Sequence, residues 1–174
     1  MSEGKEKSIV SEIVKIVLGS VIIAILYGIV HDMVTAHTEI SYFTLFHVKV
    51  VESQSPVILA LVWGVIATWW VGGIAGLLVA ASAQMGSKPK FSARRALNYV
   101  ARGAVFTLIV AMGSLAYFLG SSEGKVLEFQ PDPSDLSGRF YAVFMTHNIS
   151  YWLSAIVTIV VCVVITMKRS KEAI

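Results

Sequence analysis

The stretch Pro56–Ala83, PVILALVWGVIATWWVGGIAGLLVAASA, is long, apolar and free of charged side chains. A helix needs about 20 mainly apolar residues to cross the hydrocarbon core of a bilayer, and this stretch is longer than that. Backbone polar groups in lipid must be satisfied within their own segment, so a helix is the expected structure. Ser55 and Pro56 supply an N-cap followed by proline at the first helical position.

Three more charge-free apolar windows accompany this segment: Ile16–Val30, Gly103–Leu119 and Phe140–Met167. Only 14% of the 174 residues are charged, against about 25% in an ordinary soluble protein. We therefore predict an all-α integral membrane protein, a four-transmembrane-helix bundle that forms a single membrane domain over residues 1–174. The predicted helices lie at about 9–31, 56–84, 93–119 and 139–167.

The charges in the loops predict the orientation. The connection at 85–102 and the C-terminal tail are rich in Lys and Arg, which favours the cytoplasm by the positive-inside rule. The other two loops hold seven acids against three bases, so we expect them outside, with both termini cytoplasmic. The basic cytoplasmic segments then account for the net charge of +3. The lipid bilayer is the expected partner, and no nucleic-acid partner is expected. A lone Cys162 excludes an intrachain disulfide.

The two outer loops are long. The first, 32–55, has about 24 residues and the second, 121–138, about 18, whereas 2–8 residues are typical between the helices of a bundle. Long loops of this kind are more often functional than idle. The first loop is rich in aromatic and β-branched residues, so we expect a short hairpin or a segment lying on the bilayer interface.

Titratable side chains gather at the outer ends of two predicted helices. His31 and Asp32 close the first helix, and His147 lies about two turns into the apolar part of the last one, so topology places them in the same leaflet. A titratable side chain at membrane depth is costly and is a functional-site hypothesis by default. Imidazole and carboxylate ligands suit a transition-metal ion such as Zn, Cu or Fe. The candidate ligands are His31, Asp32, His47 and His147, with His37 and Glu39 as weaker members.

Other uses of these residues stay open at this point. His31 and His147 could be axial ligands of a haem between the helices, which is the less favoured cofactor. His31, Asp32 and His147 could relay protons, since histidine titrates near neutral pH. His147 could also make only one structural hydrogen bond, to a backbone carbonyl or to Tyr27. No nucleophile elbow, P-loop or dinucleotide fingerprint is present, so a metal-dependent membrane enzyme is a further alternative and the question of catalysis stays open.

Small and hydroxylated side chains recur every three or four residues on the predicted helices. Gly72 and Gly76 form a GxxxG pair, which permits close helix packing within the chain or in a homo-oligomer. Similar stripes would pack against other helices or line a hydrated ion path. They comprise Ser20, Ala24, Tyr27 and His31; Gly103, Thr107, Ala111 and Ser114; and His147, Tyr151, Ser154, Thr158, Cys162 and Thr166.

Three short motifs, YGIVHDMVT (27–35), YFTLFH (42–47) and HNISYW (147–152), resemble a group of small bacterial four-span inner-membrane proteins. That group shares YGIxHDxxT…EYFTxxH after the first helix and HNxSY in the last. Ser41 stands where the pattern has glutamate, Glu39 is two residues away, and His37 lies outside the pattern. The resemblance implies a bacterial inner-membrane protein whose shared residues lie on the outer side, and no activity carries over from the group. The matching residues are His31, Asp32, Thr35, Tyr42, Phe43, Thr44, His47, His147, Asn148, Ser150 and Tyr151.

The expected function is the binding or conduction of a cation, either a transition metal or a proton, at the outer His/Asp site. The alternative from another class is a non-catalytic accessory or oligomeric scaffold subunit of a larger membrane complex. In that case the GxxxG face would make the subunit contacts and the first loop would bind the partner.

Overall fold

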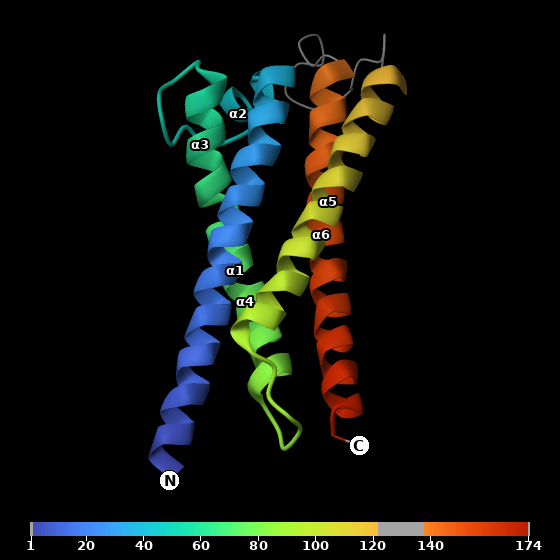
Figure 1. The fold of residues 1–174 in the computed structure, drawn as a ribbon. Helices are drawn as coiled ribbons and strands as arrows, with labels where there is room; N and C mark the ends of the chain where they lie inside the picture. The colour runs from blue at the N-terminus through green and yellow to red at the C-terminus, as the bar shows by residue number, and fades with distance from the viewer. Residues whose placement is uncertain (1, 122–137, 174) are drawn as a thin grey trace.

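The computed structural model describes residues 2–121 and 138–173, which are mainly helical and include no strand. Four helical segments are long and apolar enough to cross a membrane: Ser8–Thr38, Pro56–Gln84, Ala93–Ser121 and Gly138–Lys171. This confirms the predicted all-α bundle with four spans (Figure 1). The helices are α1 (Ser2–Thr38), α2 (Ser41–Thr44), α3 (Pro56–Ile66), α4 (Trp69–Gln84), α5 (Ala93–Ser121) and α6 (Gly138–Lys171).

The first helix, predicted at about 9–31, is longer than predicted at both ends. It continues past His31 to Thr38, and its polar side chains there bond to carbonyls one turn back: the Thr35 hydroxyl donates to His31 O at 3.2 Å and the Thr38 hydroxyl to Val34 O at 2.9 Å. The stretch that follows forms the short helix α2, where a hairpin or an interfacial segment was expected. Residues 122–137 of the second long loop lie outside the described residues.

The second span is divided into α3 and α4 at Ala67–Thr68, where one continuous helix was predicted. The Thr68 hydroxyl donates to Gly64 O at 2.5 Å. The Thr68 amide donates to Val65 O at 3.3 Å, an i→i−3 hydrogen bond typical of a 3₁₀ turn. A Cβ built on Gly64 would lie 2.6 Å from the Ile29 amide nitrogen. The break therefore lies beside a close backbone contact between α3 and α1.

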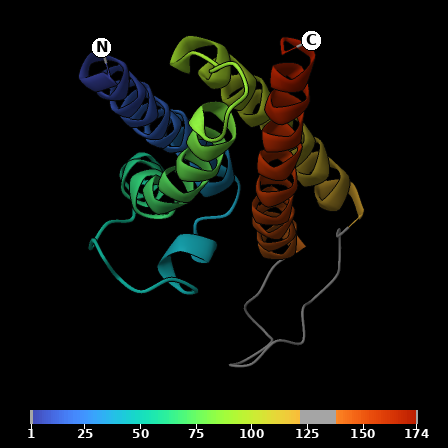
Figure 2. The ribbon, with the colours of Figure 1, turned by 90° about the horizontal axis from the view of Figure 1, so that it is seen from below.

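The helices pack as two groups. α1 lies against α3 and α4, and α5 lies against α6 (Figure 1). Seen from below, α4 lies between α1 and α6 and joins the groups (Figure 2). Gly72 and Gly76 face α1, because a Cβ on Gly72 would lie 2.7 Å from Ala24 Cβ and one on Gly76 would lie 2.9 Å from Val17 Cα. The GxxxG pair therefore packs within the chain.

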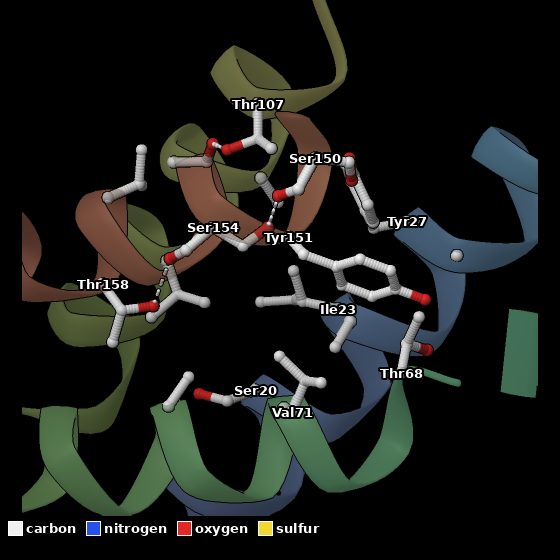
Figure 3. Close-up of a pocket in the computed structure, with 18 of the residues that line it drawn as sticks. Ser20, Ile23, Tyr27, Thr68, Val71, Thr107, Ser150, Tyr151, Ser154 and Thr158 are labelled. Carbon is white, nitrogen blue, oxygen red and sulfur yellow. Dashed lines mark hydrogen bonds between the residues drawn. The ribbon is translucent and has the colours of Figure 1, made fainter. Parts of the chain in front are cut away.

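Two apolar clusters fill the ends of the bundle. Both termini lie at one end, and α2 lies at the opposite end (Figure 1). One cluster, at the termini end, is Ile16, Val79, Ala80, Ala83, Phe91, Ala93, Ala96, Val161 and Ile165. The other, at the α2 end, is Ala36, Tyr42, Phe43, Leu59, Leu115, Phe140, Ala142 and Val143. A cavity of about 110 Å³ lies among α1, α4, α5 and α6 (Figure 3).

Candidate metal centre

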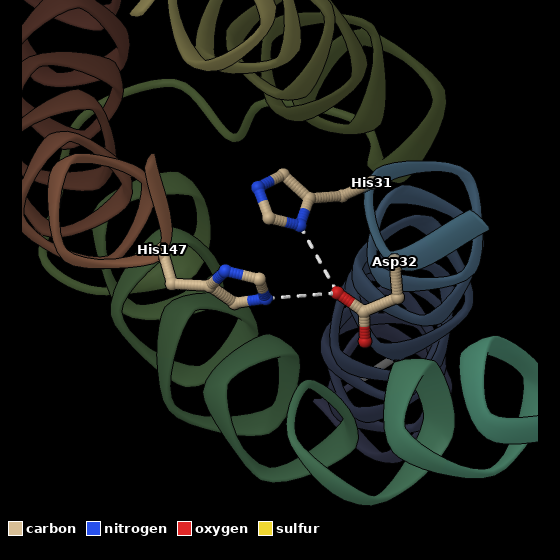
Figure 4. A group of neighbouring side chains, drawn as sticks. All are labelled: His31, Asp32 and His147. Atoms are coloured by element: carbon tan, nitrogen blue, oxygen red, sulfur yellow. Dashed lines mark hydrogen bonds and ion pairs between the residues drawn. The ribbon is translucent and has the colours of Figure 1, made fainter. Parts of the chain in front are cut away.

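Three of the predicted ligands meet inside the bundle at the α2 end. His31 and Asp32 come from α1 and His147 comes from α6 (Figure 4). One potential ligand atom of each lies within 4.8 Å of those of the other two. All three side chains are buried, with 2%, 5% and 6% of the residue surface exposed. Among the described residues, this is the group of His, Cys, Asp or Glu side chains arranged closely enough to hold a metal ion.

A single carboxylate oxygen joins the two imidazole rings. Asp32 Oδ1 lies 3.0 Å from His31 Nδ1 and 3.3 Å from His147 Nε2. On the far side of its ring, His147 Nδ1 lies 2.9 Å from the carbonyl oxygen of Val143. A carbonyl only accepts, so Nδ1 of His147 carries a proton and donates it to Val143 O.

This hydrogen bond fixes what His147 presents to Asp32. When the ring is neutral and Nδ1 is protonated, Nε2 has a lone pair. That lone pair then points at a carboxylate oxygen, which is also rich in electrons. Two facing acceptors in a buried site repel each other unless a positive charge lies between them. A proton or a metal ion between Nε2 and Oδ1 would remove this repulsion.

Local helix geometry positions the rings. Val143 is one turn before His147 on α6, so its carbonyl is the natural acceptor for a histidine whose ring turns back along the helix. The two histidine rings meet edge to face, with centroids 4.6 Å apart and planes at 88°. Rings in such direct contact leave no space for a porphyrin between them. The arrangement fits a small ion and does not fit a haem held by this pair.

Aromatic side chains enclose the cluster. Tyr42 of α2 stacks on the His147 ring, with centroids 4.2 Å apart and planes at 29°. On α1, Tyr27 stacks on His31 at 5.8 Å, and its hydroxyl shares a hydrogen bond of 2.5 Å with Ser150 Oγ on α6. These contacts cover part of the cluster, and the Tyr27–Ser150 hydrogen bond connects α1 to α6. Charge interactions are strengthened in such a low-dielectric environment.

The other three candidate ligands do not join the group. His37 lies on the exposed side of α1, with its Nδ1 2.6 Å from Met33 O. Glu39 accepts hydrogen bonds from the amide and hydroxyl of Ser41, at 3.2 and 2.7 Å. His47 lies within the first loop, with its Nδ1 2.8 Å from Tyr42 O and its ring centroid 4.5 Å from that of Trp63.

Sequence reasoning missed the supporting groups. The Val143 carbonyl could not be predicted as a partner of His147, because every residue has a backbone carbonyl and the sequence does not distinguish this one. Tyr42 lay within the YFTLFH motif and was noted as a match, but its contact with His147 depends on α2 folding back over α6. The Tyr27–Ser150 hydrogen bond joins a residue of the predicted stripe on the first helix to a residue of the HNxSY motif that lies outside the predicted stripes.

His47 makes the packing of the first loop sensitive to pH. Burial lowers the pKa of His47 from 6.5, and the hydrogen bond to Tyr42 opposes this shift in part. Below about pH 6.5 the unfolded loop binds more protons than the packed loop does, so the packed loop loses stability as the pH falls. We expect amide exchange over residues 41–47, corrected for the intrinsic rate, to accelerate between about pH 7.5 and about pH 5.5. His47→Gln should remove most of this change, and an unaltered pH dependence in that variant would contradict the assignment.

Comparison with protein-family models, with curated proteins and with solved structures found no match for this chain. Its function is therefore inferred from its own residues.

Proposed function

We propose that this membrane protein binds a transition-metal ion at the His31–Asp32–His147 cluster. The observation that carries the proposal is the orientation of His147. Its Nδ1 donates to Val143 O at 2.9 Å, and its Nε2 faces Asp32 Oδ1 at 3.3 Å. A divalent ion between the two imidazoles and the carboxylate would satisfy all three groups at once.

The donor set and the spacing fit such an ion. Neutral imidazole nitrogens and a carboxylate oxygen are typical ligands of Zn²⁺, and imidazole also suits Cu and Fe. Ligand atoms on a tetrahedral ion with bonds of about 2.0–2.2 Å lie about 3.3–3.6 Å apart. The observed separations of 3.0 and 3.3 Å from Asp32 Oδ1 are close to this range. Three protein ligands would leave a fourth position for water or a bound molecule.

The surroundings of the ligands also support a metal. A metal-binding histidine usually donates its second ring N–H to a backbone carbonyl or a carboxylate, which fixes the ring and the tautomer. The Val143 carbonyl does this for His147. His31 faces Asp32 with Nδ1, so in the metal-bound form its remaining proton would be on Nε2.

A proton is the second candidate, favoured by the shared oxygen. If His147 carried protons on both nitrogens, its Nε2 would donate to Asp32 Oδ1, which also receives His31 Nδ1. One added proton would then complete a chain of hydrogen bonds from α1 to α6. A cluster of this kind relays protons and binds no metal tightly.

We further infer that the site faces the outside of a bacterial inner membrane. The basic connection between α4 and α5 lies at the same end of the bundle as both termini (Figure 1). The last turn of α6 there carries Lys168, Arg169 and Lys171. The positive-inside rule favours the cytoplasm for this end. The cluster lies toward the opposite end.

Metal content measured on the purified protein tests the proposal. After dialysis against trace metal, we expect close to one transition-metal ion per chain in the wild type by elemental analysis. Removing one of three ligands should lower the affinity about 100-fold or more, the range that even supporting residues reach. His147→Ala and Asp32→Asn should therefore lose most of the bound metal.

His37→Ala is the matched control, because His37 is on the same helix as His31 but lies outside the cluster. It should retain the wild-type metal content. Each variant should also elute as a single folded species before its metal is counted. A folded wild-type protein without stoichiometric metal would rule out the metal site and leave the proton as the cation.

A further inference from the structure

The cavity among α1, α4, α5 and α6 extends away from the His31–Asp32–His147 cluster. The residues that line it include the three side chains of the cluster and also Ser20, Val79 and Val161. Its volume is about 110 Å³, whereas a single water needs about 10–15 Å³ on the same measure. The cavity is therefore large enough for a chain of several atoms.

The wall of this cavity suits hydrocarbon better than water. Much of it is made by small or apolar residues such as Gly28, Ala67, Ala75 and Ala104. Several hydroxyl groups line it, but they bond to their own helices. Thr107 donates to Gly103 O at 3.0 Å, Ser154 to Ser150 O at 2.7 Å, and Thr158 to Ser154 O at 2.8 Å. These hydroxyls have committed their protons and offer a water only acceptor lone pairs, whereas a buried water needs two to four polar partners.

Two polar atoms of α1, unlike the hydroxyls above, have no hydrogen-bond partner. Among the residues that the structure describes, Ser20 Oγ and His31 Nε2 are the buried side-chain polar atoms without a hydrogen-bond partner. Both residues line the cavity and are at most 2% exposed. Figure 4 shows His31 Nε2 on the side of the ring away from Asp32. An unsatisfied buried polar group costs about 1–3 kcal/mol, so each atom marks a position where a ligand oxygen would be stabilised.

An aromatic side chain in the same cavity is left uncovered. The Tyr151 ring points into the space between α1 and α6 (Figure 3). Tyr151 lines the cavity, and 46% of its surface is exposed, counting the cavity and the outer surface of the bundle together. An apolar molecule along the cavity would cover this ring, as lipid chains cover aromatic surfaces elsewhere in membranes.

We propose that the cavity binds a single-chain, membrane-soluble lipid with an uncharged oxygen headgroup, namely a carbonyl or a hydroxyl. The headgroup oxygen would lie on His31 Nε2, and the chain would run along α1 toward Ser20. These two residues are eleven positions apart, which corresponds to about 16 Å of helix. A quinone with an isoprenoid or alkyl tail and a long-chain alcohol both have this chemistry.

The neighbouring groups exclude other lipid classes. In the metal-free site, an anionic headgroup on His31 would lie close to the Asp32 carboxylate, which is 3.0 Å from the other ring nitrogen, and like charges in a buried site repel strongly. A phospholipid would also bring two chains and a charged phosphate into an apolar cavity. His31 serves an uncharged oxygen in either protonation pattern, since Nε2 accepts from a hydroxyl when Nδ1 is protonated and donates to a carbonyl when Nδ1 binds a metal. The lipid site therefore does not require the metal site.

Thermal unfolding in nanodiscs of one synthetic phosphatidylcholine tests this proposal. The probes are decylubiquinone, 1-decanol and decane at matched concentrations. We expect at least one of the two probes with an oxygen headgroup to raise the unfolding temperature saturably, by mass action on the folded state. Decane, which cannot bond to His31 or Ser20, should give a much smaller rise. A larger effect of decylubiquinone identifies a carbonyl headgroup, and a larger effect of decanol identifies a hydroxyl.

Variants separate this site from the metal site. Ala75→Leu fills the cavity and should abolish the stabilisation by the probes while the metal content stays at the wild-type level. Gly73→Leu is the control on the same helix, because nothing lies within 4 Å of a Cβ at that position, and it should respond as the wild type does. Equal shifts with all three probes, no shift with any, or shifts that persist in Ala75→Leu would overturn the proposal.

Discussion

Replacing Arg169 with leucine is expected to lower the free energy of unfolding by roughly 3 kcal/mol or more. Arg169 is only 3% exposed at the end of α6. Its guanidinium donates to four backbone carbonyls, one in the last turn of α4 and three in the connection between α4 and α5. Nε bonds to Pro89 O at 2.7 Å, Nη2 to Met85 O at 2.8 Å and to Lys88 O at 3.1 Å, and Nη1 to Ser82 O. Leucine would leave these acceptors without their donor and would separate the connection from α6.

Two further variants identify the cause. Arg169→Lys keeps the positive charge but replaces a planar fork with a single ammonium, which cannot reach four carbonyls. We expect it to recover only part of the lost stability. Arg94→Leu removes a positive charge at an exposed position of α5 and should have little effect. The measurement is unfolding by denaturant titration in detergent micelles. Wild-type stability in Arg169→Lys would show that charge alone, as the positive-inside rule requires, is the role of this residue.

Gly72→Ala is expected to destabilise the bundle by about 1–3 kcal/mol, the usual cost of overpacking. The added Cβ would lie 2.7 Å from Ala24 Cβ, 2.8 Å from Val21 Cα and 2.9 Å from Ser20 O. Two of these atoms belong to the backbone of α1 and cannot rotate away. α4 must therefore move from α1, which weakens the close packing that replaces hydrophobic drive between helices in lipid. Gly72→Leu should be worse.

Gly73→Ala is the matched control for this prediction. It makes the same chemical change one residue away, where a Cβ meets nothing within 4 Å, and alanine favours helix over glycine by about 1 kcal/mol. It should leave the stability unchanged or raise it slightly. The comparison uses the same denaturant titration. Equal stabilities of the two alanine variants would contradict the account of α1–α4 packing.

The four spans could be predicted because they rest on length and composition alone. Charge-free windows reveal a membrane helix whatever its neighbours are. The break at Ala67–Thr68 could not be predicted, because neither residue is a helix breaker. It lies beside the close approach of Gly64 to α1, a tertiary contact that has no local signature. The end of α1 was also missed, since its last turns are polar and resemble a loop in a hydropathy profile.

The three residues of the cluster could be predicted from topology, but the orientation of their rings required coordinates. His31, Asp32 and His147 could be placed in one leaflet by counting along the helices. His37 was included on the assumption of an extended chain after His31. In the helix that forms instead, six residues rotate the side chain by about 240°, which turns His37 to the exposed side. The tautomer of His147 depends on its 2.9 Å hydrogen bond to Val143 O, which no sequence pattern encodes.

X-ray absorption at the edge of the bound metal tests most directly whether His31, Asp32 and His147 together hold a metal ion. We expect nitrogen and oxygen atoms at about 2.0–2.2 Å from the metal, with outer-shell scattering from two imidazole rings. His147→Ala, reloaded with excess metal, should show only one imidazole. A shell of oxygen atoms alone, or a wild-type spectrum without imidazole scattering, would contradict the account.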